Sequence, residues 1–205
     1  EWSITYNGCK ATDAVIVNYI VWPIPDFEPS SYTGCSPLEV NFVNTSIGGA
    51  PYSWNFGDGS SSSQPNIVHT FQDPGQYTVK LTATAPLGNI VTIEKKITVH
   101  GHPIANFDIA PKLIYIPGQQ ISCFNYSVYA DASYWNFGDG TTAVSALAPK
   151  YTYKDTGRFD ITLKVINTYN CADSITMSSI VHVKKRSEIF FPEADASRRF
   201  RAAPF

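Results

Sequence analysis

The hexapeptide WNFGDG occurs twice in this chain of 205 residues, at Trp54–Gly59 and again at Trp135–Gly140. The two tryptophans that open the copies are 81 positions apart. Identity at six consecutive positions indicates an internal repeat, and a period of this length accommodates one small β domain with its own core. The sequence therefore predicts a chain of repeated domains.

The similarity between the copies continues beyond the hexapeptide. HTFQDPGQYTVKL (His69–Leu81) parallels YTYKDTGRFDITL (Tyr151–Leu163) after one inserted residue. The opening YNGCKATDAVIVNYIV (Tyr6–Val21) parallels TYNCADSITMSSIVHV (Thr168–Val183), which indicates the end of a third copy. The predicted organisation is the C-terminal strands of a preceding repeat in 1–23, complete domains in 24–100 and 101–184, and a linker or truncated sorting domain in 185–205.

Side-chain periodicity predicts strands throughout both copies. Tyr52, Trp54 and Phe56 alternate with polar residues, which is the period of two that places one face of a strand in a core. The further strands expected from such patterns and from turn signals are an opening strand that ends at Phe27, Glu39–Asn44, Ile67–Phe71, Tyr77–Ala83 and Ile90–Val99, then Ala105–Phe107, Gln120–Tyr126, Tyr134–Phe137, Pro149–Tyr153, Phe159–Ile166 and Ser174–Val183. The predicted fold class is all-β, with tandem sandwiches in an extended arrangement because prolines stiffen the joints.

Composition excludes several classes of partner. Fifteen Lys and Arg residues against seventeen Asp and Glu give a net charge of −2, which offers no positive field for a nucleic acid backbone. The most apolar stretch, Ala14–Pro25, contains Asn18 and two prolines and is too short for a membrane helix. We expect no nucleic acid partner, no transmembrane segment and no cofactor.

WNFGDG, together with the HTF and DPGQYTVKL that follow it, resembles the polycystic kidney disease (PKD) repeat, whose hallmark reads W-D-F-G-D-G. The resemblance covers roughly residues 24–184, with Asn55 and Asn136 in place of the first Asp of the hallmark. It implies immunoglobulin-like β-sandwiches. Related repeats act mostly as spacers or as binding and adhesion modules of surface proteins.

A narrower resemblance concerns the source of the repeats. GCSPLEVNFVNTS (Gly34–Ser46) and YNGC look like tandem repeats of Bacteroidetes cell-surface and gliding-motility proteins exported by the type IX secretion system. EIFFPEA (Glu188–Ala194) is similar to the start of their sorting domain, although the residues after it depart from that pattern. The resemblance implies a secreted, outer-membrane-associated protein whose C-terminal segment contacts secretion machinery.

The G-D-G segments carry the most conspicuous polar motif. Glycines on both sides of Asp58 and Asp139 permit positive φ angles, while each carboxylate caps nearby amides, so we interpret both as structural turns. The alternative is calcium binding by these two carboxylates. Such a site needs several acidic groups in one loop, and the following residues are serines or threonines.

Aromatic residues raise the question of sugar stacking. Trp54, Phe56, Trp135 and Phe137 alternate with polar residues, so we assign them to the cores rather than to a binding platform. Aromatics expected at the surface, and therefore better binding candidates, are Trp2, Trp22, Tyr32 and Tyr129.

The four cysteines form no C-x-x-C pair, so disulfides are favoured over a metal or redox site. Cys123 and Cys171 occur only in the second copy, and a bridge between them is the leading prediction. Cys9 and Cys35 are then a pair by default, and buried free thiols are the alternative for all four.

No sequence feature indicates catalysis, because neither a G-x-S-x-G elbow nor an equivalent nucleophile motif occurs. We predict a non-enzymatic extracellular module of a large bacterial surface protein, which acts as a spacer, an adhesion region or a protein-interaction region. Its partners would be other repeats of the same protein and protein or glycan ligands. The alternative is a carbohydrate-binding accessory module of a secreted polysaccharide-degrading enzyme.

Overall fold

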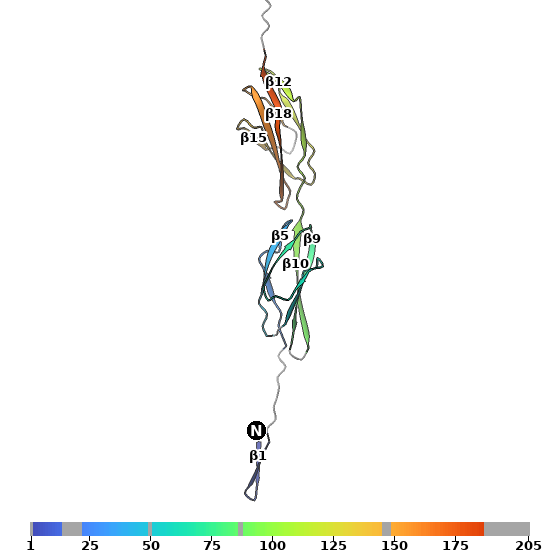
Figure 1. Ribbon diagram of the computed structural model, residues 1–205, viewed down its shortest axis with the longest axis vertical. Coiled ribbons are helices and arrows are strands. Elements are labelled where there is room, and N and C mark those ends of the chain that lie inside the picture. Colours follow the sequence, from blue (N-terminus) through green and yellow to red (C-terminus); the bar gives the residue numbers. More distant parts are fainter. Residues whose placement is uncertain (1, 14–21, 49–50, 86–87, 145–148, 187–205) are drawn as a thin grey trace, which may run out of the picture. The chain divides into compact units, whose positions relative to one another are not determined.

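A computed structural model describes residues 2–13, 22–48, 51–85, 88–144 and 149–186. The chain divides into two compact units at the bond between Gly101 and His102. Every regular element among the described residues is a β-strand (Figure 1). We use repeat 1 for residues 22–101 and repeat 2 for residues 102–186.

Repeat 1 consists of two sheets. Its three-stranded sheet has the order β3-β5-β8, and its five-stranded sheet has the order β4-β10-β9-β6-β7. Neighbouring strands are antiparallel except β4 and β10, which are parallel. The bounds are β3 Phe27–Pro29, β4 Thr33–Cys35, β5 Leu38–Asn44, β6 Tyr52–Asn55, β7 Ser61–Ser62, β8 Ile67–Phe71, β9 Gly75–Thr84 and β10 Ile90–His100.

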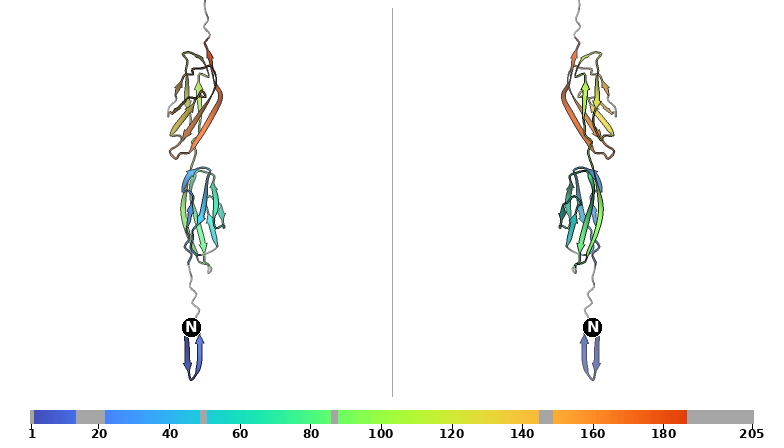
Figure 2. Two further views of the ribbon diagram at one scale, coloured as in Figure 1. Left: turned by 90° about the vertical axis from the view of Figure 1, so that its left-hand side faces the viewer. Right: turned by 90° about the vertical axis from the view of Figure 1, so that its right-hand side faces the viewer.

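Repeat 2 has the same topology, with sheets β11-β13-β16 and β12-β18-β17-β14-β15 (Figure 2). Here β12 and β18 form the parallel pair. The bounds are β11 Phe107–Ala110, β12 Leu113–Ile116, β13 Ile121–Asn125, β14 Ala132–Asn136, β15 Thr142–Val144, β16 Lys150–Tyr151, β17 Gly157–Ile166 and β18 Ala172–Lys185. The predicted all-β class with tandem sandwiches is confirmed.

Each repeat buries its own apolar core between its two sheets. Alternate residues of the central strands point inward, as in β9, where Val79 and Leu81 are buried between more exposed neighbours. The core of repeat 2 follows the same alternation in β17, with Ile161 and Leu163 buried. This burial of every second residue matches the alternation of apolar and polar residues along these strands of the sequence.

The structure adds strands that periodicity did not predict. The short edge strands β4, β7, β12 and β15 pair along one side only and carry few core residues, so their sequences lack a clear alternation. The opening strand also begins at Phe27, where it was predicted to end. A further hairpin, β1 (Trp2–Tyr6) with β2 (Cys9–Asp13), precedes repeat 1. The described residues include no helical segment with the length and hydropathy that a bilayer crossing requires.

Candidate functional site

The aromatic residues of both WNFGDG copies lie inside the sandwiches. Trp54 and Phe56 are buried in repeat 1, and Trp135 and Phe137 are buried in repeat 2. The Trp54 ring packs edge-on against Phe27, with the two centroids 5.1 Å apart. These rings therefore contribute packing to the cores, as their alternation predicts, and their faces are not accessible to a ligand.

The polar residues of the first copy close a turn with their own side chains. Asn55 Oδ1 accepts a hydrogen bond of 2.9 Å from the Gly57 amide. Asp58 Oδ1 accepts two more, at 2.9 Å from the Ser60 amide and at 2.5 Å from the Ser60 hydroxyl. The turn is a pair of linked Asx turns, which is the geometry that Asn and Asp favour outside regular structure.

The second copy repeats this geometry with threonine in place of serine. Asn136 Oδ1 accepts from the Gly138 amide at 2.9 Å. Asp139 Oδ1 accepts from the Thr141 amide at 3.0 Å and from the Thr141 hydroxyl at 2.6 Å. Residues of these types at these positions therefore hold the same turn in both repeats.

The two turns differ in the residue that contacts the second carboxylate oxygen. In repeat 1, His69 of β8 places Nε2 at 2.7 Å from Asp58 Oδ2 and stacks on the Phe56 ring with centroids 4.1 Å apart. In repeat 2, Tyr151 of β16 donates to Asp139 Oδ2 at 2.6 Å and stacks on the corresponding phenylalanine at 3.9 Å. An imidazole in one repeat and a phenol in the other thus contact the second carboxylate oxygen of two turns with the same geometry.

These contacts set the protonation of the two carboxylates. Partial burial alone would raise the pKa of Asp58, but hydrogen bonds from Ser60 and His69 outweigh it and lower the pKa below its ordinary value. Burial alone would also raise the pKa of Asp139, but hydrogen bonds from the Thr141 and Tyr151 hydroxyls outweigh it and lower the pKa. Among the described residues, no group of three or more His, Cys, Asp or Glu side chains lies close enough together to hold a metal ion.

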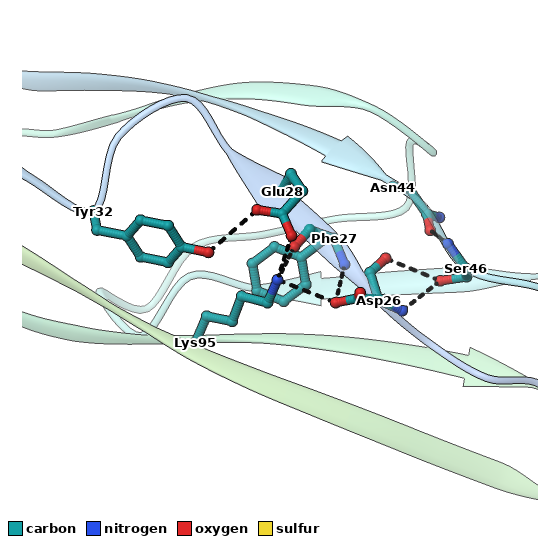
Figure 3. Close-up of polar contacts among 7 residues, drawn as sticks. All are labelled: Asp26, Phe27, Glu28, Tyr32, Asn44, Ser46 and Lys95. Carbon is teal, nitrogen blue, oxygen red and sulfur yellow. Dashed lines mark hydrogen bonds and ion pairs between the residues drawn. The ribbon is translucent and has the colours of Figure 1, made fainter.

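A second polar cluster joins the two sheets of repeat 1 (Figure 3). Lys95 of β10 places Nζ at 3.1 Å from both Asp26 Oδ1 and Glu28 Oε1, and it donates to the Phe27 carbonyl. Tyr32 donates to the other oxygen of Glu28 at 3.3 Å. Burial alone would lower the pKa of Lys95, but these hydrogen bonds outweigh burial and raise the pKa above its ordinary value.

Repeat 2 lacks this cluster, because a methionine occupies the position of the lysine. Lys95 lies opposite Val79 in its sheet, and Met177 lies opposite the corresponding Ile161. The cluster is therefore a local feature of repeat 1 and is not required by the fold.

Substitution Lys95→Met, which copies repeat 2, should lower the free energy of unfolding of repeat 1 by about 1 kcal/mol or less. The effect is small because the Asp26 and Glu28 side chains are 52% and 61% exposed, so that water screens the ion pairs. Denaturant unfolding at low salt and at about 1 M salt measures it, and the loss should shrink at high salt. A loss that stays unchanged in high salt would contradict this account.

The cysteines correct the predicted pairing. Cys35 and Cys171 are each disulfide-bonded, whereas Cys9 and Cys123 are free. The predicted Cys123–Cys171 and Cys9–Cys35 bridges are therefore wrong. The physical reason is position: Cys123 points into the core from the middle of β13, whereas Cys171 lies in the turn before β18, held by a 3.0 Å hydrogen bond to Asn167 Oδ1.

Alkylation of the folded, unreduced chain should therefore separate the cysteines into three classes. Exposed Cys9 should react first, and Cys123 should react only after unfolding, because burial removes access and raises its pKa to about 11. Cys35 and Cys171 should react only after reduction. Peptide mass spectrometry reads out the order, and a disulfide-linked peptide containing Cys123 would contradict it.

Three of the four aromatic residues that the sequence places at the surface are exposed in the structure. Trp22, Tyr32 and Tyr129 are exposed, but they are spread over both units, and the Trp2 side chain lies outside the described residues. The structure instead places Phe124 and Tyr126 together on the outer face of one sheet. Alignment with repeat 1 could have identified this pair. Cys123 corresponds to the inward-facing Phe42, so the residues next to Cys123 in the strand must face outward.

Repeat 2 also contains an open pocket of about 510 Å³ at the end of the sandwich where β12 and β18 finish. It is lined by side chains of both charges, among them Lys154, Asp155 and Lys185, and by the buried Tyr153. The Tyr153 hydroxyl donates to the Phe137 carbonyl at 2.9 Å. The pocket therefore combines a packed wall with a solvated rim of mixed charge.

Two sheets that pack face to face, with motif turns closed by their own side chains, define an immunoglobulin-like β-sandwich module that occurs twice. The family is established by comparison with known proteins. The family model described as PKD domain matches residues 22–99 and 124–183, and the chain belongs to this family.

The curated relatives are much larger proteins. Collagenase ColA of Clostridium perfringens (strain 13 / Type A) is 46% identical over 48 residues, which cover 23% of this chain and 4% of the collagenase. Collagenase ColA of Bacillus cereus is 40% identical over 52 residues, which cover 25% of this chain and 5% of the collagenase. The match thus spans about a twentieth of the length of these relatives.

Solved PKD domains are also similar to this chain. The PKD1 domain from Vibrio cholerae metalloprotease PrtV is 24% identical with a TM-score of 0.33, over 40% of this chain and 98% of the domain. The PKD1 domain of Vibrio anguillarum Epp is 31% identical with a TM-score of 0.33, over 40% of this chain and 100% of the domain.

Proposed function

We propose that this chain is a non-catalytic repeat module of a larger extracellular protein, in which the paired sandwiches act as a spacer, an adhesion region or a protein-interaction region. The observation that carries the proposal is the internal use of the motif's polar groups. In both repeats the Asn and Asp side chains of WNFGDG bind amides and hydroxyls of their own turn. Groups committed to holding a turn supply stability rather than acid, base or nucleophile chemistry.

An extracellular location is supported by the state of the cysteines. Cys35 and Cys171 are disulfide-bonded, and disulfides persist mainly in oxidising compartments. The small share of the collagenases that this family match covers also fits a module within a longer protein. Export by the type IX system and attachment to the outer membrane remain part of the proposal, and the segment Glu188–Ala194 on which they rest lies outside the described residues.

A second candidate function is supported by one feature. The exposed pair Phe124 and Tyr126 in repeat 2 favours a carbohydrate-binding accessory module of a secreted polysaccharide-degrading enzyme. Exposed apolar side chains that adjoin one another commonly mark a contact surface, whereas single exposed apolar residues do not.

The spacer role is tested by placing the intact chain between two fluorescent reporters and measuring energy transfer between them. The expected transfer efficiency stays constant with added denaturant until the repeats unfold. It should differ throughout that range from the efficiency across a Gly-Ser linker of equal length, which behaves as a flexible coil. Equal efficiencies would refute the spacer role, and hydrolysis of gelatin, casein or a polysaccharide by the purified chain would refute a non-catalytic module.

A further inference from the structure

Two aromatic side chains lie close together on the outer face of the three-stranded sheet of repeat 2. Phe124 is 41% exposed and Tyr126 is 58% exposed, whereas Cys123 between the sheets is fully buried. The two positions are separated by one residue and share a face, so their Cα atoms are about 6.8 Å apart along the strand. Both rings therefore present apolar surface to solvent within the length of a short ligand.

The backbone that carries Tyr126 is held firmly. The Tyr126 amide donates to the Asn106 carbonyl at 2.8 Å, which extends the β11–β13 ladder past the end of β13. On either side, Asn125 Oδ1 accepts from the Ser127 amide at 2.9 Å, and the Asn106 amide donates to the Ser127 hydroxyl at 3.0 Å. The backbone of such a segment loses little additional freedom when the ring that it carries binds a ligand.

Repeat 1 has the same clamp but not the aromatic pair. Asn44 Oδ1 accepts from the Ser46 amide at 3.0 Å, and the Asp26 amide donates to the Ser46 hydroxyl at 3.1 Å (Figure 3). The residues that correspond to Phe124 and Tyr126 are Val43 and Thr45. The fold therefore forms without the two rings, and their presence in repeat 2 calls for another explanation.

Polar side chains flank the rings on β13 itself and on the two strands beside it. Asp108 lies opposite Phe124 in β11, and its carboxylate is 3.0 Å from the Lys112 ammonium group. On the other side, Ser122 of β13 lies opposite Lys150 of β16. The rings are thus bordered by hydroxyl, carboxylate and ammonium groups that can exchange hydrogen bonds with a polar ligand.

We propose that this surface, defined by Phe124, Tyr126, Asn106, Asp108, Ser122 and Lys150, binds the sugar rings of an extended polysaccharide. The face of an aromatic ring carries partial negative charge, so the C–H groups on the flat side of a pyranose ring pack against it. The flanking polar side chains suit the hydroxyls at the ring edge. The core of a protein–protein interface is depleted in charged residues, and this surface has charged groups on both sides of its aromatics.

This inference rests on the second candidate function and is independent of the spacer role. The experiment measures retention of the intact chain on insoluble cellulose, chitin and arabinoxylan, compared with the double variant Phe124→Val, Tyr126→Thr. The variant copies repeat 1, so its thermal unfolding should match that of the original chain. We expect retention on at least one of the three polysaccharides, weakened roughly tenfold or more in the variant.

Three outcomes would overturn the proposal: no retention on any of the three, equal retention of the double variant, or self-association of the chain that the double variant abolishes. Self-association would show that a second copy covers this face. The reverse exchange in repeat 1, Val43→Phe with Thr45→Tyr, should add a second binding surface and strengthen retention. None of these variants should alter the energy transfer across the chain. Failure of the binding proposal can therefore be distinguished from failure of the spacer role.

Discussion

Replacing Gly138 by alanine should lower the free energy of unfolding of repeat 2 by about 3 kcal/mol or more. Gly138 has a φ of +80°, a left-handed conformation that costs an L-residue about 1–2 kcal/mol. An added Cβ would also collide with the Asp160 carbonyl oxygen of β17 and lie 3.1 Å from the Asp160 amide nitrogen. Both neighbours are backbone atoms of a central strand, and the residues on either side of Asp160, Phe159 and Ile161, are paired with β18, so neither atom moves freely.

The second glycine of the same turn is the matched control. Gly140 has a φ of +90°, but nothing lies within 4 Å of an added Cβ. Gly140→Ala should therefore cost only the conformational term of about 1–2 kcal/mol. Hydrogen exchange of peptides from β17 measures repeat 2 separately from repeat 1. Equal losses for the two variants would show that the approach to Asp160 does not constrain the turn.

The sequence predicted that these glycines adopt positive φ, and it did not predict that only the first glycine of each G-D-G touches the neighbouring strand. In repeat 1 the Cβ of an alanine at Gly57 would lie 2.8 Å from the Thr78 carbonyl oxygen, whereas Gly59 has open space. The turn can be predicted from the motif because its hydrogen bonds join residues only two positions apart. The close approach depends on the register of β6 on β9 and of β14 on β17, which sequence periodicity leaves open.

The same distinction explains the errors on the cysteines. Cys123 aligns with Phe42, and the structure buries both side chains because the alternation of β13 matches that of β5. Pairing requires the distance between two Cα atoms, and a disulfide closes only over a short and specific range. Sequence separation carries no such distance, so a cysteine in a strand centre and one in a turn were paired wrongly.

The sequence also did not predict which residues contact the second carboxylate oxygen of each motif turn. His69 and Tyr151 occupy corresponding positions in the parallel segments HTF and YTY, but nothing in either segment indicates contact with a carboxylate at Asp58 or Asp139. The contact forms because the three-stranded sheet packs over the turn of the five-stranded sheet. Contacts between sheets depend on tertiary packing, and strand periodicity identifies only which face a residue occupies.

Substitution Asp58→Asn should lower the free energy of unfolding of repeat 1 by about 1–2 kcal/mol at pH 7 and by almost nothing at pH 2. Asparagine keeps an oxygen that accepts from the Ser60 amide but lacks the charge that His69 contacts. Asp58 is 21% exposed, so its hydrogen bonds are only partly screened by water. Hydrogen exchange of peptides from β9 across the pH range measures the difference.

The direction of the pH dependence follows from the lowered pKa of Asp58. Its ordinary pKa is 3.8, and the folded value lies below it, so the unfolded chain takes up the proton first as the pH falls. The carboxylate therefore stabilises the fold fully above its unfolded pKa, and this stabilisation is lost as the pH falls through the folded value. The loss caused by Asp58→Asn should be constant between about pH 5 and pH 7 and should shrink below about pH 4.

Asp139→Asn provides the comparison in repeat 2, because the pKa of Asp139 is also lowered and a neutral phenol takes the place of the imidazole. The exchange His69→Tyr then tests whether the partner matters. It copies the Tyr151 contact of repeat 2, so it should preserve the acid dependence caused by Asp58. A loss for Asp58→Asn that remains undiminished at pH 2 would mean that the carboxylate charge does not stabilise the turn and that the amide and hydroxyl hydrogen bonds alone hold it.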